Sequence, residues 1–304
     1  MNAITHAGTL HRLENAAPTP DHDAIRALYA QTQQDFCAWS RGYNMHFGYW
    51  QRGMSLLRRE PMLERMNDVA IDALGIQRDA HVRIVDLGCG AGATARAAAR
   101  RHPCATVIGV TLVRESIALA MKMDRAAGLS RRVAYALTDL ANSWMASGTM
   151  DGALALESFC YAAGADKATA AREAARLLRP GARLVVVDGF LAGDEPQGVF
   201  GWVYRRWCDC WAVPRLGRLD AFVRALEEAG FEKVEVRDLF WRVAPSAAHI
   251  PWVAACHTVR ELWRGRGHIS AWRRRHIEAS WLSIVLGLAR GKFRYCMVTA
   301  TRRA

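Results

Sequence analysis

A glycine-rich segment between a predicted strand and a predicted helix is the feature that most constrains the fold. Residues 81–87 (HVRIVDL) have the apolar, β-branched character of a buried strand, and residues 94–101 are rich in alanine and arginine, which favour a helix. Gly88, Gly90 and Gly92 lie between them. Glycines at such a junction let the backbone turn tightly and approach a ligand closely. The segment therefore predicts a βαβ unit with a nucleotide-type cofactor at the carboxyl end of the strand.

The rest of the chain continues this alternation of short strands and longer helices. Further strands are predicted at 106–110, 133–137, 152–156, 183–188, 233–237 and 294–301. Helices are predicted at 115–127, 166–178 and 219–229. The pattern predicts an α/β fold with a doubly wound, mostly parallel, seven-stranded, Rossmann-like sheet.

The segments outside this alternation suggest a division of the chain. Residues 1–24 are predicted to be a flexible leader, and residues 25–78 a helical segment that covers the site. Residues 79–304 are predicted to form the main domain, with a helical cap at 239–292 between the last two strands. The leader lacks the apolar core of a secretory signal, and no apolar run approaches the roughly 20 residues that span a bilayer, so we expect a cytoplasmic protein. The eight scattered cysteines form no metal-binding pattern and are expected to be reduced.

The glycine segment alone does not choose the cofactor, because Gly88, Gly90 and Ala93 also satisfy the dinucleotide pattern G-x-G-x-x-A. Two further residues argue against a dinucleotide. Asp86 would repel a pyrophosphate but would attract the ammonium group of S-adenosylmethionine. Thr111 ends the second strand, where a dinucleotide site needs an acid for the ribose.

Three motifs together resemble the class I S-adenosylmethionine-dependent methyltransferases. They are D-x-G-x-G-x-G at residues 86–92, T-D-L at residues 138–140 and L-L-R-P-G at residues 177–181. The resemblance implies a cofactor site made by Tyr49, Asp86, Gly88, Gly90, Gly92, Thr111, Leu112, Asp139 and Leu140. A degenerate methyltransferase that binds the cofactor as a partner subunit is an alternative, against which the intact glycine segment and Asp139 argue.

Finer features are similar to the branch that holds sterol, tocopherol and prenyl diphosphate C-methyltransferases. These are GVTL at 109–112, LESF at 156–159 and HFGYW at 46–50. Ser116 stands where that branch commonly has a glutamine, which leaves Glu115 as a substitute for binding the ribose.

The resemblance implies C-methylation of an isoprenoid or prenyl diphosphate alkene, and O- or N-methylation of an aromatic or alkaloid-like natural product is the alternative. Methylation of an alkene leaves a carbocation, which needs aromatic faces for stabilisation and a base to remove a proton. Glu157, after the fourth strand, is the candidate base, with a capping or cofactor-contacting role as the alternative. His46 is a second candidate base or a structural histidine. The resemblance implies that Tyr43 lies near the sulfonium, where it would attract and orient the cation.

The positive charge of the chain is concentrated at its end. Residues 241–304 contain 12 basic residues and only two acids, Glu261 and Glu278, which gives this segment a net charge of +10. The net charge of the whole chain is +12. The arginines have three explanations. They bind an anionic group on a lipophilic substrate, together with Mg²⁺ if that group is a diphosphate; they contact anionic lipid; or they are the solvated face of a cap helix. The sequence contains no recognisable nucleic-acid-binding module, so we expect no nucleic-acid partner. The aromatic residues at 202, 204, 207 and 211 are expected on one helix face, either in the core or in the substrate pocket.

Overall fold

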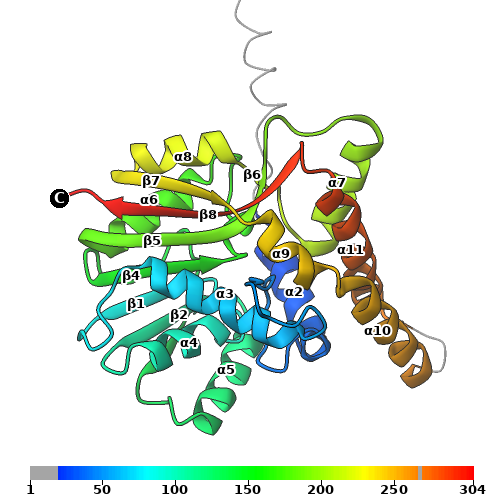
Figure 1. Cartoon of the computed structure of the whole chain (residues 1–304), viewed down its shortest axis with the longest axis horizontal. Coiled ribbons are helices and arrows are strands. Elements are labelled where there is room, and N and C mark those ends of the chain that lie inside the picture. The colour runs from blue at the N-terminus through cyan, green and yellow to red at the C-terminus, as the bar shows by residue number, and fades with distance from the viewer. Residues whose placement is uncertain (1–19, 266–268) are drawn as a thin grey trace, which may run out of the picture.

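The protein is built around one twisted sheet, described here from a computed structural model that covers residues 20–265 and 269–304 (Figure 1). The strand order is β3-β2-β1-β4-β5-β8-β7, and the short strand β6 (Gly217–Arg218) pairs with β5. All of the neighbouring pairs are parallel except those made by β8, which runs antiparallel to β5 and β7. The main strands are β1 (Arg83–Leu87), β2 (Thr106–Thr111), β3 (Val133–Leu137), β4 (Met150–Leu156), β5 (Leu178–Leu191), β7 (Phe231–Asp238) and β8 (Phe293–Arg302).

The order of the strands reverses between β1 and β4, which are adjacent in the sheet but are separated in the chain by β2 and β3. Chain connections therefore leave β1 and β4 in opposite directions, and a crevice opens at their carboxyl ends. The glycine segment follows β1, and Glu157 follows β4. The topology thus brings the two parts of the predicted site to one place.

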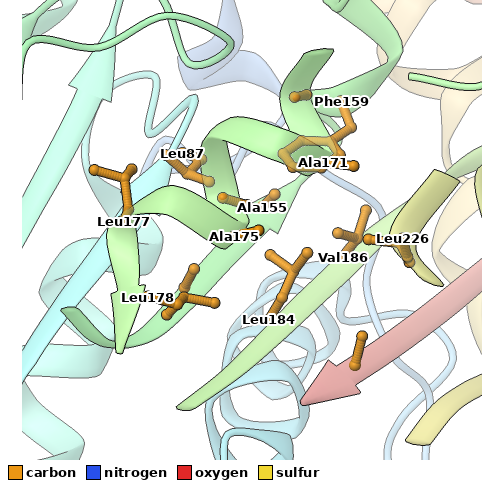
Figure 2. Packing of buried hydrophobic residues seen from close by; sticks show 14 of the residues in the cluster. Leu87, Ala155, Phe159, Ala171, Ala175, Leu177, Leu178, Leu184, Val186 and Leu226 are labelled. Atoms are coloured by element: carbon orange, nitrogen blue, oxygen red, sulfur yellow. The ribbon is translucent and has the colours of Figure 1, made fainter. Parts of the chain in front are cut away.

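Both faces of the sheet are buried, so the central strands are mostly apolar, with Asp86 of β1 and Asp188 of β5 as buried exceptions. Alternate residues of β4 and β5 face opposite sides: Ala155 and Val186 join the cluster with helices α6 (Ala168–Leu177) and α8 (Leu219–Glu228). Figure 2 shows this packing, in which Ala171 and Leu226 of the two helices lie over the strands. On the other face lie α3 (Arg59–Ala73) and α4 (Ala93–Arg101). Helix α5 (Arg114–Ala126) connects β2 to β3.

The α/β, mostly parallel architecture predicted from the sequence is confirmed. The described residues add one short strand, β6, to the seven predicted strands, and the boundaries differ mainly at β5. The sequence predicts this strand at 183–188, but it extends to Leu178–Leu191. Leu178 pairs with Met150 of β4, and the far end pairs with β8 as far as Leu191 and Phe293. Long-range pairing has therefore extended the strand through the Pro180-Gly181 sequence.

Helices at the amino end of the described chain cover the carboxyl edge of the sheet. Helix α2 (His22–Thr32) and the 3-10 helix η1 (Gln33–Ala38) precede α3. Residues 1–19, most of the predicted leader, lie outside the described residues. Helix α2 begins inside the range predicted as leader, because Asp21 caps it by accepting a hydrogen bond from the amide of Ala24.

Three helices fill the segment between β7 and β8: α9 (Phe240–Ala247), α10 (Ile250–Arg264) and α11 (Ala271–Leu288). In Figure 1, α10 and α11 project to one side of the sheet beside α7 (Gly198–Trp211). Polar contacts between α11 and α7 include an ion pair of Glu278 with Arg206 and a hydrogen bond that Ser283 accepts from Trp207. Within residues 20–265 and 269–304, no helix combines the length and the apolar character needed to cross a bilayer.

Candidate active site

The glycine segment forms a tight turn at the carboxyl end of β1. Gly88, Gly90 and Gly92 all have positive φ angles, between 49° and 86°, which side chains with a Cβ rarely adopt. Gly88 and Gly90 line a cavity, here called the cofactor pocket. Gly92 lies behind it as the N-cap of α4, where a Cβ would collide with Tyr135. The segment therefore brings backbone rather than side chains to the pocket wall.

Asp86 presents a carboxylate with an unsatisfied oxygen to the cofactor pocket. Its side chain is only 2% exposed, and Oδ2 makes no hydrogen bond within the described part of the chain. Burial raises the pKa of Asp86 to about 7. A buried acceptor without a partner is costly, and a bound ammonium group would satisfy it. This site therefore fits the cationic end of S-adenosylmethionine.

Residues after β2 and β3 form the wall at the other end of the cofactor pocket. Thr111, Leu112 and Leu140 line it, so apolar side chains are available to sandwich a flat ring. Asp139 does not line this pocket. It lies in a neighbouring concavity, together with Glu115, where His22 Nε2 is 3.5 Å from its Oδ2. Leu112 and Thr138 line both hollows, so Asp139 lies beside the cofactor pocket rather than in its wall.

Ser116, which stands where the C-methyltransferase branch commonly has a glutamine, lines the cofactor pocket. Its hydroxyl donates a hydrogen bond of 2.9 Å to Oε1 of Gln33, from η1. The amide nitrogen of Gln33 in turn donates to the carbonyl of Glu115. A glutamine from a distant segment thus lies buried beside Ser116, an arrangement that local sequence could not reveal.

Glu157 lies where the cofactor pocket meets a second cavity. Its φ angle is +50°, an unusual value for a residue with a side chain. Oε1 accepts hydrogen bonds from the hydroxyl of Tyr295 at 2.6 Å and from the amide of Phe47 at 2.7 Å. Burial raises the pKa of Glu157 to about 7, against the lowering effect of these two hydrogen bonds. A carboxylate held in this way and poised near neutral pH suits a general base.

His46 and Tyr43 also line the cofactor pocket, and His46 lines the second cavity as well. Both ring nitrogens of His46 are occupied: Nε2 is 3.1 Å from Oδ1 of Asn67, and Nδ1 is 2.9 Å from the carbonyl of Phe47. Burial lowers the pKa of His46, against the raising effect of the contacts with Phe47 and Asn67, so the neutral form is favoured. Neutral imidazole has a single N–H, which donates to one of these two oxygens. These contacts suit an orienting role for His46 better than proton removal.

The HFGYW segment links Glu157 to the cap. The amide of Gly48 donates to Ser246 of α9, and the amide of Trp50 donates to the carbonyl of Arg242. A Cβ on Gly48 would lie 2.6 Å from Cβ of Met62, so only glycine allows this close approach to α3. Tyr49 lines neither pocket, and the guanidinium of Arg242 lies over its ring at 5.4 Å. The structure therefore places Tyr49 at the base of the cap.

The second cavity, here called the acceptor pocket, lies under α10 and α11. Its apolar wall is formed by Phe36, Trp39, Met45, Phe47, Trp211, Ile250, Val253, Ala254 and Ile277. Met45, His46 and Glu157 are shared with the cofactor pocket, so the two cavities meet at these side chains. Among the described residues, no lysine or arginine lines the acceptor pocket.

The aromatic residues of α7 do not share one environment. Tyr204 is fully buried, and its hydroxyl accepts a hydrogen bond from the amide of Leu216. Trp207 contacts α11, whereas Trp202 is largely exposed. Trp211 alone of the four lines the acceptor pocket, with its ring centroid 5.0 Å from that of His276.

A charged cluster closes the end of the acceptor pocket that lies under the cap. Asp35, His257 and Glu261 are buried and place potential metal ligands close together. However, Arg273 donates to Asp35 at 3.0 Å and lies 3.0 Å from Glu261, so its guanidinium already bridges both carboxylates. This donor set does not fit Mg²⁺, because a cationic side chain occupies the position between the two acids.

The arginines of the cap therefore differ in their surroundings: Arg273 is paired with buried acids, whereas Arg274 and Arg275 are exposed. We expect Arg273→Gln to lower the free energy of unfolding by roughly 1–3 kcal/mol, because Asp35 and Glu261 would be left buried without their cation. The double variant Arg274→Gln/Arg275→Gln, which changes exposed residues, should unfold like the wild type. Urea unfolding followed by circular dichroism measures both. Equal losses in the two variants would contradict this division.

Several residues of the site could not have been identified from the sequence. Tyr295 lies in the last strand and reaches Glu157 only because β8 inserts between β5 and β7. Tyr29 of α2 and Tyr161, which follows β4, also line the cofactor pocket. Their hydroxyls lie 2.7 Å apart, although the two residues are far apart in the chain. The alternating pattern of residues 294–301 was the one available signal, since it indicated which side chains of this strand face inward.

Comparison with known proteins is consistent with this geometry. Residues 84–181 match the family model described as a methyltransferase domain. The chain is 30% identical over 203 residues to the methyltransferase GfsG of Streptomyces halstedii, which covers 67% of this chain and 71% of that protein. It is 29% identical to the O-methyltransferase resE of Aspergillus sclerotiorum, over 66% of this chain and 73% of that protein.

Its fold is also similar to that of solved methyltransferase structures. The geranyl diphosphate C-methyltransferase of Streptomyces coelicolor A3(2), in complex with Mg²⁺, geranyl diphosphate and S-adenosyl-L-homocysteine, superposes with a TM-score of 0.69. Identity is 17%, and the match covers 94% of this chain and 99% of that one. Together with the glycine segment and the unsatisfied carboxylate of Asp86, these similarities show that the chain belongs to the class I S-adenosylmethionine-dependent methyltransferases.

Proposed function

We propose that this methyltransferase transfers the methyl group of S-adenosylmethionine to a carbon of a lipophilic, isoprenoid-type alkene, with Glu157 as the base. The observation that carries the proposal is the position of Glu157 at the junction of the cofactor pocket and an apolar pocket with aromatic walls. Bound S-adenosylmethionine supplies an electrophilic methyl group on a sulfonium. The protein must align the acceptor with it and exclude water.

The residues of the acceptor pocket suit the charge that alkene methylation develops. Phe36, Trp39, Phe47 and Trp211 present aromatic faces, which stabilise a nearby carbocation. Tyr295 and the amide of Phe47 hold Oε1 of Glu157, and these are the only hydrogen bonds to its carboxylate from the described residues. Oε2 is therefore available to take the proton whose loss restores a double bond.

The walls of the acceptor pocket also bear on the charge of the acceptor. A diphosphate within the pocket would find no lysine or arginine among the described lining residues, and the nearby Arg273 is already paired with Asp35 and Glu261. We therefore propose an acceptor that is neutral at the end which reaches Glu157. The Mg²⁺ expected for a diphosphate is not part of this proposal.

O-methylation of a hydroxyl group is the second candidate. It is favoured by the same carboxylate, since a base with a pKa of about 7 can also remove the proton of a phenol or an enol during transfer. The similarity to the O-methyltransferase resE supports this alternative. The two candidates differ in the atom that receives the methyl group, which can be measured directly.

The test is incubation of the purified protein with methyl-labelled S-adenosylmethionine and a panel of farnesol, geraniol, geranyl diphosphate, simple phenols and amines. We expect a labelled prenol product that keeps its exchangeable hydroxyl proton, as determined by mass spectrometry and NMR. Geranyl diphosphate should be a poorer acceptor than geraniol. A methyl ether as the main product would replace C-methylation by O-methylation, and transfer to amines alone would overturn both candidates.

A further inference from the structure

One face of α10 is apolar and exposed to solvent. Its side chains, at intervals of three or four residues, are those of Trp252, Ala255, Cys256, Val259, Leu262 and Trp263. Trp252, Val259 and Trp263 are 72%, 67% and 83% exposed. The opposite face of the same helix is buried and contributes to the acceptor pocket. A continuous apolar face on a surface helix indicates a binding surface rather than chance exposure.

A small opening beside this face leads toward the acceptor pocket. Trp252, Cys256, Arg59 and Arg260 line it, together with Ala38, Val253 and His257. The last three residues also line the acceptor pocket, so the opening and the pocket meet there. The apolar face of α10 therefore lies at a route by which a lipophilic molecule could reach Glu157.

Basic and apolar residues continue around the opening. Arg260 and Arg264 flank the apolar face, and Arg58 is exposed in the loop before α3. This loop adjoins the start of α10, because Nε2 of His249 is 2.8 Å from the carbonyl of Leu56. Leu57 in the same loop is 88% exposed. The surface thus combines protruding apolar side chains with a basic rim.

The charge of this surface decides between a second copy of the chain and a lipid surface. Symmetric pairing of two α10 faces would bring like-charged Arg260 and Arg264 side chains together. In the described part of the cap, Glu261 is shared by three arginines: its Oε2 is 3.0 Å from Arg273, and its Oε1 is 4.0 Å from both Arg260 and Arg264. Glu278 is paired with Arg206, so the positive charge of Arg260 and Arg264 is only partly balanced. Anionic lipid headgroups would neutralise the arginines, and tryptophan side chains favour the region between headgroups and acyl chains.

We propose that the α10 face docks on the surface of an anionic lipid bilayer and that the acceptor passes from the bilayer through the adjoining opening into its pocket. Trp252, Val259 and Trp263 enter the boundary between headgroups and acyl chains, while Arg58, Arg260 and Arg264 contact the headgroups. Docking is independent of the methyl transfer reaction. The access route rests on the proposed function, since it assumes a lipophilic acceptor.

Docking is tested with the full chain, without cofactor or acceptor, on vesicles of phosphatidylcholine alone or mixed with phosphatidylglycerol. We expect co-sedimentation only with the anionic vesicles, weakened by added salt, and quenching of tryptophan fluorescence by brominated lipid. Val259→Gln/Trp263→Gln should lower the vesicle partition coefficient by about tenfold or more. The matched control is Trp144→Gln, which changes an exposed tryptophan between β3 and β4 and should bind like the wild type.

Three outcomes would overturn the docking proposal. They are the absence of binding to anionic vesicles, an equal loss of binding in the Trp144→Gln control, or a dimer in solution, by light scattering, that Val259→Gln/Trp263→Gln dissociates. The last result would assign the face to a second copy of the chain. Because none of these measurements uses methyl transfer, a failure here is distinguishable from a failure of the proposed function.

The access route is tested separately by filling the opening. Cys256→Trp should raise KM for farnesol presented in vesicles by about tenfold or more, while the Kd for S-adenosylmethionine remains unchanged. Ala255→Trp is the control, because Ala255 is on the same exposed face but does not line the opening. An equal effect of both substitutions on KM would contradict the route and leave the docking result standing.

Discussion

Replacing Glu157 with Gln is expected to reduce kcat by about 10²- to 10⁴-fold, because the amide keeps the shape of the side chain but cannot accept a proton. The Kd for S-adenosylmethionine, measured by calorimetry, should change little. Oε1 of the wild-type carboxylate already accepts two hydrogen bonds, which an amide oxygen can also accept. A variant that retains full activity on an isoprenoid acceptor would exclude Glu157 as the base.

The pH dependence of kcat provides an independent check on the same residue. Burial raises the pKa of Glu157 to about 7, so activity should rise as pH increases through 7 and the carboxylate loses its proton. Tyr295→Phe removes a hydrogen bond that lowers this pKa. The rise should therefore move to higher pH in this variant, with a smaller loss of kcat at the plateau than in Glu157→Gln. An unshifted profile would show that Tyr295 does not act through Glu157.

Replacing Asp86 with Asn is expected to weaken S-adenosylmethionine binding by roughly 10- to 150-fold, the loss of about 1.5–3 kcal/mol for a hydrogen bond to a charged group. Burial raises the pKa of Asp86 to about 7, and a bound cation favours the ionised form. Wild-type affinity should therefore increase as pH rises through 7. The Asn variant should lack this dependence, which calorimetry at several pH values measures.

The same substitution should stabilise the protein without cofactor at high pH. Burial raises the pKa of Asp86 above that of an unfolded aspartate, so its contribution to stability is fully present at low pH and is lost as pH rises through about 7. Asp86→Asn removes this loss, and its Tm at pH 8 should exceed that of the wild type.

Asp151→Asn provides the control. Asp151 is a carboxylate near the start of β4 that accepts a hydrogen bond from the amide of Arg83. This variant should have a lower Tm and an unchanged Kd. A lower Tm in Asp86→Asn as well would contradict a cost of burying the Asp86 charge.

The sequence predicted the fold and the cofactor end of the site because both depend on local signals. The positive φ angles at Gly88 and Gly90 favour glycine, and Asp86 is fixed by its place in β1. These features lie within a few residues of one another, so their geometry follows from the turn itself. Glu157 was also found locally, since it directly follows β4 at the edge of the sheet where ligands bind.

What the sequence could not provide depends on contacts between distant segments. The partner of Glu157, Tyr295, and the partner of Ser116, Gln33, are both brought there by tertiary packing. The basic residues of the cap illustrate the same limit. Composition suggested an anionic substrate group or anionic lipid as their partner, but it could not show that Asp35 and Glu261 neutralise Arg273.

The amino-acid sequence by itself therefore determined the sheet, the glycine turn and the cofactor, because hydrophobic periodicity and backbone strain act over short distances along the chain. Only the tertiary structure decided which side chains face the acceptor. It depends on how α10 and α11 pack over the acceptor pocket. Their packing turns apolar side chains toward the pocket and leaves arginines on the outside of the cap.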